Sequence, residues 1–432
     1  MRRIFKSAGT ATAYVDEDLS LFAALLSLLL LAALKNDSSL GEVGDLVTQM
    51  VSHPFVALLK SKSIYIFAPV FALSIAAMVF FKSRLTVKPA MPSLLFCALL
   101  LYATIRAAIG GSDLGSKVFQ GLLIMTLVAV FTGLRRVNRG DATVSHTIAL
   151  VFFWFSIIIV ALNLFTYLSG YGYVGINARF FGTTAHPNFI GAQLAIAAIS
   201  LTHFSIRASF GKAIAICLLA VASLWLIYCT GSRTAIVIAV TGIYVASWAK
   251  LSARAKVGLT AVVLLGIIVA VLSGGFQLGD DEMSVYDRGN TRDAAWSYLV
   301  DAIVENPMWG RGYFEGFSED SWLRGWSTFG VLYFVLMVSA ILSGAWRLTA
   351  RRQSHPVHRM NLSLLLGLLC GLCAGAVFEG YLCDTFSVPV LSVVFVLAAA
   401  SPAKGRSKAT RQVSSKTHLV SGPTVVADIS GP

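Results

Sequence analysis

The residues best suited to chemistry lie in one long polar stretch, from Phe276 to Trp326, which interrupts an otherwise apolar chain. It holds four arginines (Arg288, Arg292, Arg311 and Arg324) and ten carboxylates between Asp280 and Asp320. A guanidinium group can bind phosphate through paired hydrogen bonds, and a carboxylate can take the proton of an attacking hydroxyl. We therefore expect the chemistry of this protein in this stretch.

One of these arginines stands at the start of a predicted helix. Apolar side chains at i, i+3, i+4 and i+7 (Trp296, Leu299, Val300 and Ile303) predict an amphipathic helix from about Thr291 to Glu305. Arg292 then falls in the first turn, where the positive end of the helix dipole disfavours a cation. This position favours an anionic ligand beside Arg292, and the alternative is that Arg292 stacks on Trp296 or pairs with Asp293.

A second arginine lies in an aromatic loop, Ser169–Asn188, which ends in His186-Pro187-Asn188. Tyr171 and Tyr173 precede Arg179 in this loop. Aromatic rings can cover the faces of a sugar while an arginine binds a phosphate, so the loop suits a sugar phosphate. The alternative is an aromatic belt at the membrane interface with one solvated arginine.

A third arginine, Arg233, lies in the short turn Cys229–Thr234 between two apolar runs. Gly231 and Ser232 let the backbone turn tightly, and the turn is too short for the charge to leave the membrane boundary. A charge there is costly without a partner. Either a bound anion or an internal acid, such as Glu379 or Asp384, would supply that partner.

The composition predicts the elements that must position these side chains. The 432 residues are 56% hydrophobic and 13% charged, far from the roughly 25% charge of soluble domains. Apolar runs near the ~20-residue spanning length predict an all-α polytopic membrane protein with about twelve transmembrane helices. They lie near residues 19–34, 64–81, 91–109, 118–133, 147–168, 188–204, 213–229, 235–249, 257–273, 327–346, 361–378 and 386–400.

The distribution of basic residues predicts the orientation of these helices. With the N-terminus inside, the inner segments hold 23 of the 34 Lys and Arg residues and the outer segments hold 10. This positive-inside pattern predicts two cytoplasmic termini and a large outward loop that carries the short amphipathic helix. It also accounts for most of the net charge of +13, so nucleic-acid binding is not needed to explain it.

The predicted organisation follows the same pattern. It comprises a cytoplasmic N-terminus (1–20), helices one to nine (21–273), the large periplasmic loop (274–326), helices ten to twelve (327–400) and a disordered cytoplasmic tail (401–432). The six cysteines are scattered, and Cys370 and Cys373 match a metal or redox motif only in spacing. In an apolar helix they are packing residues, and we predict no metal site.

Several motifs occur in one order along the chain and are similar to those of a known family. They are Arg179-x-x-Gly182 with His186-Pro187-Asn188, Gly231-Ser232-Arg233, Arg292-x-x-x-Trp296, Glu305-Asn306-Pro307, Gly310-x-Gly312 and Glu319-Asp320-Ser321-Trp322-Leu323 before Gly330. This series resembles the O-antigen ligase and polymerase superfamily of bacterial envelope glycosyltransferases, which includes exopolysaccharide polymerases. The resemblance spans roughly Arg179–Gly330, and the first five helices match only in hydropathy.

The resemblance implies a metal-independent glycosyltransferase of the membrane-embedded GT-C type that needs no cofactor. Its donor would be a glycan on undecaprenyl diphosphate at the outer leaflet of the bacterial inner membrane. Arg179, Arg233 and Arg292, with Arg288 nearby, would hold the diphosphate, whose growing negative charge arginines can stabilise in the transition state. We expect the glycan against the rings of Tyr171, Tyr173, His186, Trp296 and Trp322.

One departure from the ligase pattern favours a polymerase. Ligases carry His-Asn where this chain has Glu319-Asp320, which makes these two acids the candidate catalytic bases; the alternative is that they form a solvated turn or pair with Arg311 or Arg324. The predicted function is polysaccharide polymerisation by transfer to a hydroxyl of a lipid-linked repeat unit, with membrane lipid and a chain-length regulator as partners. The nearest alternative is an O-antigen ligase that transfers the glycan to lipid A-core or another acceptor. A twelve-helix transporter or flippase is less favoured, because the spans are nearly free of charge and show no internal repeat.

Overall fold

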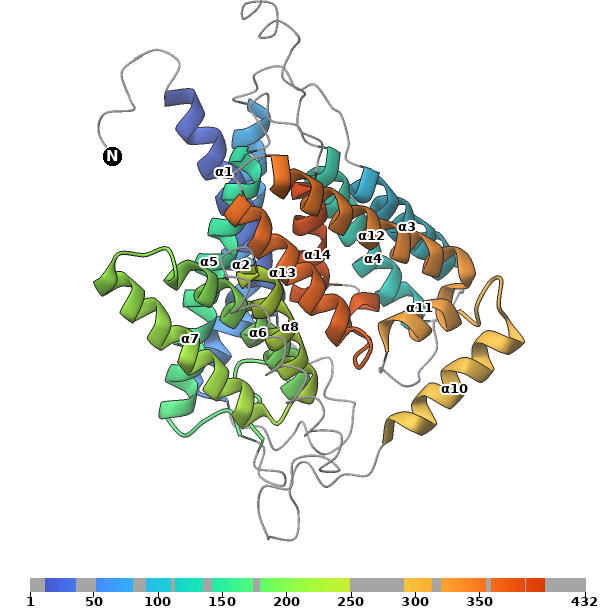
Figure 1. Ribbon diagram of the computed structural model, residues 1–432. Helices are drawn as coiled ribbons and strands as arrows, with labels where there is room; N and C mark the ends of the chain where they lie inside the picture. The colour runs from blue at the N-terminus through green and yellow to red at the C-terminus, as the bar shows by residue number, and fades with distance from the viewer. Residues whose placement is uncertain are drawn as a thin grey trace, which may run out of the picture.

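A computed structural model describes the protein as a bundle of α-helices (Figure 1). It describes residues 12–35, 52–80, 91–109, 113–134, 142–173, 179–248, 291–312, 320–354, 359–384 and 386–400. The first helices in this part of the chain are α1 (Thr12–Ala33), α2 (Pro54–Phe80), α3 (Met91–Ile109), α4 (Asp113–Leu134), α5 (Ala142–Leu168), α6 (Pro187–Ser205), α7 (Phe210–Thr230) and α8 (Arg233–Ser247). After residues 249–290 come α10 (Thr291–Glu305), α11 (Ser321–Phe329), α12 (Val331–Ser354), α13 (Arg359–Gly375), the 3₁₀ turn η3 (Tyr381–Cys383) and α14 (Val388–Ala399).

The all-helical class predicted from the apolar runs is confirmed for the described residues. A helix occupies each predicted span except 257–273, which lies outside the described residues. Five described helices, in α2, α3, α5, α7 and α12, are long and apolar enough to cross a membrane by length and composition. The protein is therefore a helical membrane protein, and the number of twelve spans stays a prediction.

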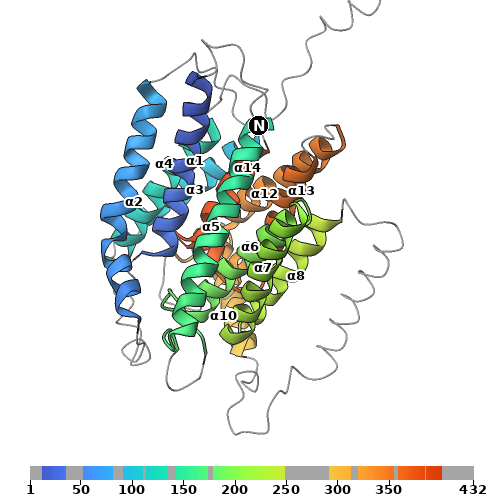
Figure 2. The ribbon, with the colours of Figure 1, turned by 90° about the vertical axis from the view of Figure 1, so that its left-hand side faces the viewer.

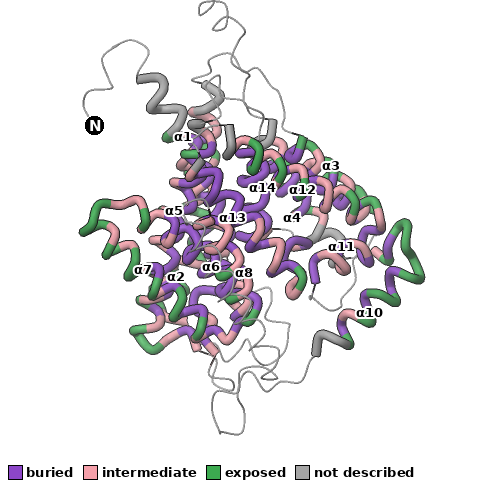
Figure 3. Tube along the Cα trace, viewed as in Figure 1, coloured by how far each residue is buried: buried purple, intermediate pink, exposed green. Residues whose placement is uncertain are grey.

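Burial separates a central layer of helices from a peripheral one (Figure 3). All twelve residues of α14 are buried, and α6 is buried along most of its length. The peripheral helix α7 instead exposes large apolar side chains, including Phe210 at 84% and Leu218 at 65%. Lipid tails can solvate such a surface and water cannot, so we assign the outer face of α7 to the hydrocarbon.

Helices α8 and α13 pack closely and antiparallel, and Figure 2 shows both in the same part of the bundle. Gly367 lies against Gly242 and Ala246, and Gly371 lies against Ile238 and Gly242. A Cβ on Gly367 would come within 2.6 Å of the Gly242 carbonyl oxygen, so glycine is what permits this approach. Because the two helices are antiparallel, a contact four residues later in α13 is made with a residue four positions earlier in α8.

Two segments of the chain between α10 and the start of α12 are held together by backbone hydrogen bonds. The amides of Arg311 and Gly312 donate to the carbonyls of Ser327 and Thr328, at 2.8 and 3.0 Å. The Val331 amide donates to the carbonyl of Pro307 at 3.0 Å. We call residues 307–312 and 326–331, which pair in this way, the loop stem.

The loop stem depends on glycine and on two side chains of α3. Gly330 has φ 87°, and a side chain there would collide with the carbonyl of Met308. Tyr102 donates to the carbonyl of Phe329 at 2.9 Å, and Arg106 donates to the carbonyl of Trp309 at 2.7 Å. Arg106, in the last turn of α3, thus attaches the loop stem to the end of a span.

Candidate active site

Arg179 is held by the end of α7 and the start of α6. The loop around it folds back on itself, since Tyr173 and Phe180 form an isolated bridge and the Phe180 amide donates to the Cys229 carbonyl at 3.0 Å. Arg179 Nε then donates to the carbonyl of Thr230 at 2.8 Å, and its Nη2 lies 3.4 Å from Asn188 Oδ1. The guanidinium is therefore fixed beside the turn that carries Arg233.

His186 forms the N-terminal cap of α6. Its Nδ1 accepts from the Asn188 amide at 3.3 Å, which requires the unprotonated ring nitrogen. The residue keeps an exposed edge, yet the protein packed around the ring and the positive charge of Arg179 lower the pKa of His186 to about 4. The ring is thus neutral near pH 7 and available as an acceptor.

Arg233 is the first residue of α8 and follows directly from a tight turn. Gly231, at φ 61°, ends α7 in the left-handed conformation, and Ser232 caps α8 by accepting from the Ala235 amide at 3.3 Å. Arg233 is exposed at this helix start. The tight turn is present as predicted, and the position of Arg233 at the membrane boundary stays a prediction.

Glu379 connects the start of α6 to the start of α8. The sequence predicted it only as a possible partner for Arg233. Its carboxylate Oε1 accepts from Asn188 Nδ2 at 2.6 Å and lies 3.4 Å from Thr234 Oγ1. The helix register explains its place, because Gly375 lies against Ile238 and the next step of four residues sets Glu379 opposite Thr234. Arg179, Asn188 and Glu379 therefore form one hydrogen-bonded chain between the starts of α6 and α8.

Asp320 has a structural task at the start of α11. Its Oδ1 accepts from the amides of Trp322 and Leu323 at 2.8 and 3.0 Å, so Asp320 is the N-cap of this helix. It is buried and has φ 51°, a strained value for a residue with a side chain. Burial raises its pKa, and the two amide hydrogen bonds oppose that shift. Its predicted neighbour in catalysis, Glu319, lies outside the described residues.

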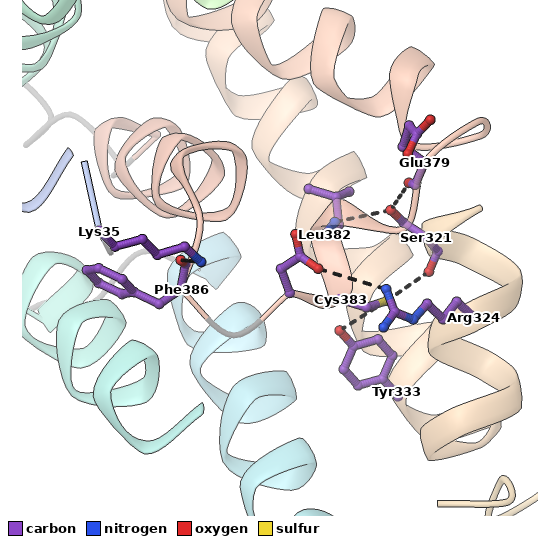
Figure 4. A network of polar contacts seen from close by, with 9 residues as sticks. Lys35, Ser321, Arg324, Tyr333, Glu379, Leu382, Cys383 and Phe386 are labelled. Carbon is purple, nitrogen blue, oxygen red and sulfur yellow. Dashed lines mark hydrogen bonds and ion pairs between the residues drawn. The ribbon is translucent and has the colours of Figure 1, made fainter. Parts of the chain in front are cut away.

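Ser321, the residue after this cap, links α11 to the site. Its Oγ donates to the Glu379 carbonyl at 2.6 Å and accepts from the Leu382 amide at 3.1 Å. Its own amide donates to the Ala376 carbonyl at 2.7 Å. The loop that carries Glu379 is therefore attached to the start of α11, directly after Asp320 (Figure 4).

A second cluster of contacts in Figure 4 joins α11 and α12 to the residues that follow Leu382. Arg324 on α11 lies 3.8 Å from Asp384, and Cys383 Sγ contacts both the Ser321 carbonyl and the Tyr333 hydroxyl. Lys35, just after α1, donates to the Phe386 carbonyl at 3.2 Å. Asp384 thus pairs with Arg324. Glu319, which was predicted as another possible partner of Arg324, lies outside the described residues.

The predicted helix at Thr291–Glu305 is present as α10, next to α11 at the edge of the bundle (Figure 1). Leu299 and Ile303 are buried as expected, whereas Val300 is 44% exposed. The side chain of Arg292 and all of Arg288 lie outside the described residues. Arg311 pairs with Glu305 and lies over the Tyr298 ring.

The aromatic residues predicted to contact glycan lie in several environments. Tyr171 meets the His53 ring at 5.0 Å, and Tyr173 lies 5.5 Å from Phe180. Trp322 is half-buried and packs on the core, while Trp296 is half-buried with no hydrogen-bond partner for its indole nitrogen in the described part of the chain. Their contact with glycan stays a prediction.

These features describe a helical membrane protein in which Arg179 and Arg233 lie beside the turn between α7 and α8. Residues 218–333 match the family model of the O-Antigen ligase. This match supports the O-antigen ligase and polymerase superfamily of glycosyltransferase-like enzymes, and the resemblance drawn from the motifs is confirmed to that extent. The match includes Arg233, α10 and α11, and leaves out Arg179 and Glu379. No curated protein matches the chain.

Proposed function

We propose that the protein is a polysaccharide polymerase of the GT-C type that uses a glycan on polyprenyl diphosphate as its donor. A hydroxyl of a lipid-linked repeat unit attacks the anomeric carbon, and the bond from that carbon to the diphosphate oxygen breaks. The diphosphate leaves with the electron pair, and the hydroxyl proton passes to a base. The observation that carries the proposal is that Arg179 is held at the Thr230 carbonyl, beside the turn that carries Arg233, and is linked through Asn188 to Glu379.

The arginines supply the electrostatic part of this reaction. Arg179 is already oriented by Thr230 and Asn188, and Arg233 is exposed at a helix start whose amides also attract anions. Arg292 and Arg288 complete the proposed diphosphate site from the loop. Oriented donors stabilise the charge of a leaving diphosphate without reorganising, so neither a metal nor a cofactor is required by this proposal.

Glu319 is the proposed base, with Asp320 as its rival. The amide hydrogen bonds of Asp320 Oδ1 support Glu319, because a carboxylate that caps a helix is held by that task. We expect Glu319→Gln to bind the lipid-linked donor and to lose elongation, typically by about 100-fold or more. Normal polymer from Glu319→Gln together with no polymer from Asp320→Asn would move the role to Asp320.

The proposed topology places this site outside the bacterial inner membrane. The basic residues of the inner segments support cytoplasmic termini and an outward loop. A reporter at Gly289 should read periplasmic, and reporters at Gly140, Ser252 and Ala409 should read cytoplasmic. A cytoplasmic reading at Gly289 would refute the proposal, because a donor at the outer leaflet could not reach the loop.

A ligase is the second candidate, and the description of the matching family favours it. Analysis of lipid-linked glycans in a deletion strain separates the two functions. Single repeat units accumulate if the protein is a polymerase, and finished long chains accumulate if it is a ligase. Absence of any outward glycan would indicate a flippase and refute both. Dependence of polymer length on a co-expressed chain-length regulator would identify that further partner.

A further inference from the structure

An apolar surface of α10 and the loop stem faces away from the protein. Helix α10 buries Ala295, Leu299 and Ala302, and its acidic side carries Asp301. Between these two sides runs a third stripe that is apolar and exposed. It consists of Val300 at 44%, Val304 at 73%, Met308 at 62% and Trp309 at 65%. We call these four residues the apolar foot.

The ends of two spans fix the level of the apolar foot in the membrane. Helix α3 ends at Ile109, and Arg106 in its last turn donates to the Trp309 carbonyl at 2.7 Å. Helix α12 begins at Val331, whose amide donates to the Pro307 carbonyl at 3.0 Å. The turn at 307–309 therefore lies between one span that leaves the membrane and another that enters it.

The apolar foot also continues the lipid-facing surface of these spans. On α3, Ile105 is 50% exposed and Ile109 is 70% exposed, and on α12, Leu332 is 47% exposed. These side chains belong to helices long and apolar enough to cross a membrane. The surface that lipid tails cover thus runs to the ends of both helices and reaches Met308 and Trp309.

The chemistry at this level matches a membrane interface. The Arg106 guanidinium lies 5.9 Å from the centre of the Trp309 ring, and tryptophan and arginine are typical of the depth where headgroups meet acyl chains. Helix α10 is apolar on one exposed stripe and charged on the next, and the combination of an apolar and a charged face is typical of helices that lie along a membrane surface. A water-exposed site would leave the four apolar side chains without a suitable solvent.

We propose that Val300, Val304, Met308 and Trp309 insert into the headgroup and acyl boundary of the bilayer, so that α10 lies on the membrane as an interfacial helix. The partner that covers the apolar foot is therefore membrane lipid. The insertion holds the first turn of α10, with Arg292, near the depth at which the phosphates of a lipid lie. The insertion itself does not depend on the proposed polymerase function, and only this last consequence rests on it.

Depth-dependent quenching tests the inference without any activity assay. Val304→Cys and Met308→Cys, in a background without the native cysteines, are labelled with the fluorophore NBD and placed in phosphatidylcholine nanodiscs. Asp301→Cys on the acidic side of the same helix is the matched control. We expect lipids with a doxyl group near the headgroup to quench the labels at 304 and 308 at least twofold more strongly than the label at 301.

Three outcomes would overturn the inference. Equal weak quenching at all three positions would place the foot in water. Strong quenching only by doxyl groups deep in the acyl chains would place it in the hydrocarbon core. Labels at 304 and 308 that are shielded from iodide yet insensitive to doxyl lipids would indicate a protein partner, such as a second copy of the chain.

A second measurement applies if the cysteine-free background does not fold. In the otherwise natural protein, Trp309→Phe should remove part of the tryptophan fluorescence that brominated lipids quench. Trp322→Phe is the control, because Trp322 packs on the core and should contribute little to that fraction. An unchanged quenchable fraction in Trp309→Phe would contradict the inference, whatever the activity of the protein proves to be.

Discussion

Removal of the Glu379 side chain should disconnect Arg179 from the rest of the proposed diphosphate site. In Glu379→Ala, Asn188 loses the acceptor that its Nδ2 contacts at 2.6 Å, and Thr234 loses its neighbour at 3.4 Å. Asn188 is also the residue that Arg179 Nη2 approaches. We therefore expect the amide of Asn188 to reorient and the guanidinium of Arg179 to lose a defined direction.

The size of the effect follows from the type of hydrogen bond that is lost. A hydrogen bond to a charged group contributes about 1.5–3 kcal/mol, and one factor of ten in rate corresponds to about 1.36 kcal/mol. Glu379→Ala should therefore reduce polymerisation ~10–100-fold. Glu379→Gln keeps an acceptor of the same size without the charge, and a loss of about 1 kcal/mol predicts a roughly fivefold reduction.

The assay is elongation of a lipid-linked repeat unit by purified enzyme, with the melting temperature of each variant measured alongside. Asp301→Ala removes an exposed carboxylate of α10 and should retain wild-type activity. If Glu379→Ala elongates at the wild-type rate, the hydrogen-bonded chain from Arg179 to Glu379 has no part in the reaction. If Glu379→Gln loses as much as Glu379→Ala, the charge itself is required and the orienting role is wrong.

Three further predictions concern other parts of the site. Arg292→Ala should lose ~10–100-fold in polymerisation and Arg292→Lys should recover only part of it, because an ammonium lacks the planar fork; full activity of Arg292→Ala at normal protein level would exclude Arg292. Because the pKa of His186 is lowered to about 4, the folded protein stays unprotonated there while the unfolded chain takes up a proton, so stability should fall as the pH decreases from 6.5 to 4. His186→Asn keeps a capping side chain without this titration, and its melting temperature should depend less on pH over that window; equal pH slopes for both proteins would contradict the assignment. Gly330→Ala should destabilise the loop stem by about 1–3 kcal/mol because of its backbone angle and the Met308 carbonyl, whereas Gly211→Ala, which meets open space, should leave the melting temperature unchanged.

The helices and the turn at Arg233 could be predicted because both depend on local properties. Length and hydropathy suffice to find a helix. The connection from α7 to α8 has only two residues, so Arg233 must lie at the start of α8. The buried face of α10 was predicted less well. Its packing uses Ala295 and Ala302, small residues that a search for large apolar side chains does not register, and Val300 therefore lies outside the contact.

Two site features depend on contacts distant in sequence. Glu379 meets Asn188 across 191 residues, and only the register of α8 against α13 brings it to Thr234. No periodicity in the sequence reports that register. Asp320 carried a local signal, since an aspartate directly before a helix is a common N-cap. The resemblance to ligases directed attention to its acidity, and the structure adds the capping role.

The packing of α8 against α13 sets the smallest part of this protein that could be exchanged with a relative. The segment that matches the family, 218–333, contains α8 and lacks both α6 and α13, so a chimera cut at those limits would inherit half of each helix contact and half of the polar chain between Arg179 and Glu379. A transplant that moves residues 179–248 together with 320–384 keeps both. We expect natural recombination between related proteins to exchange residues 179–248 and 320–384 together, because separating them would break the same contacts.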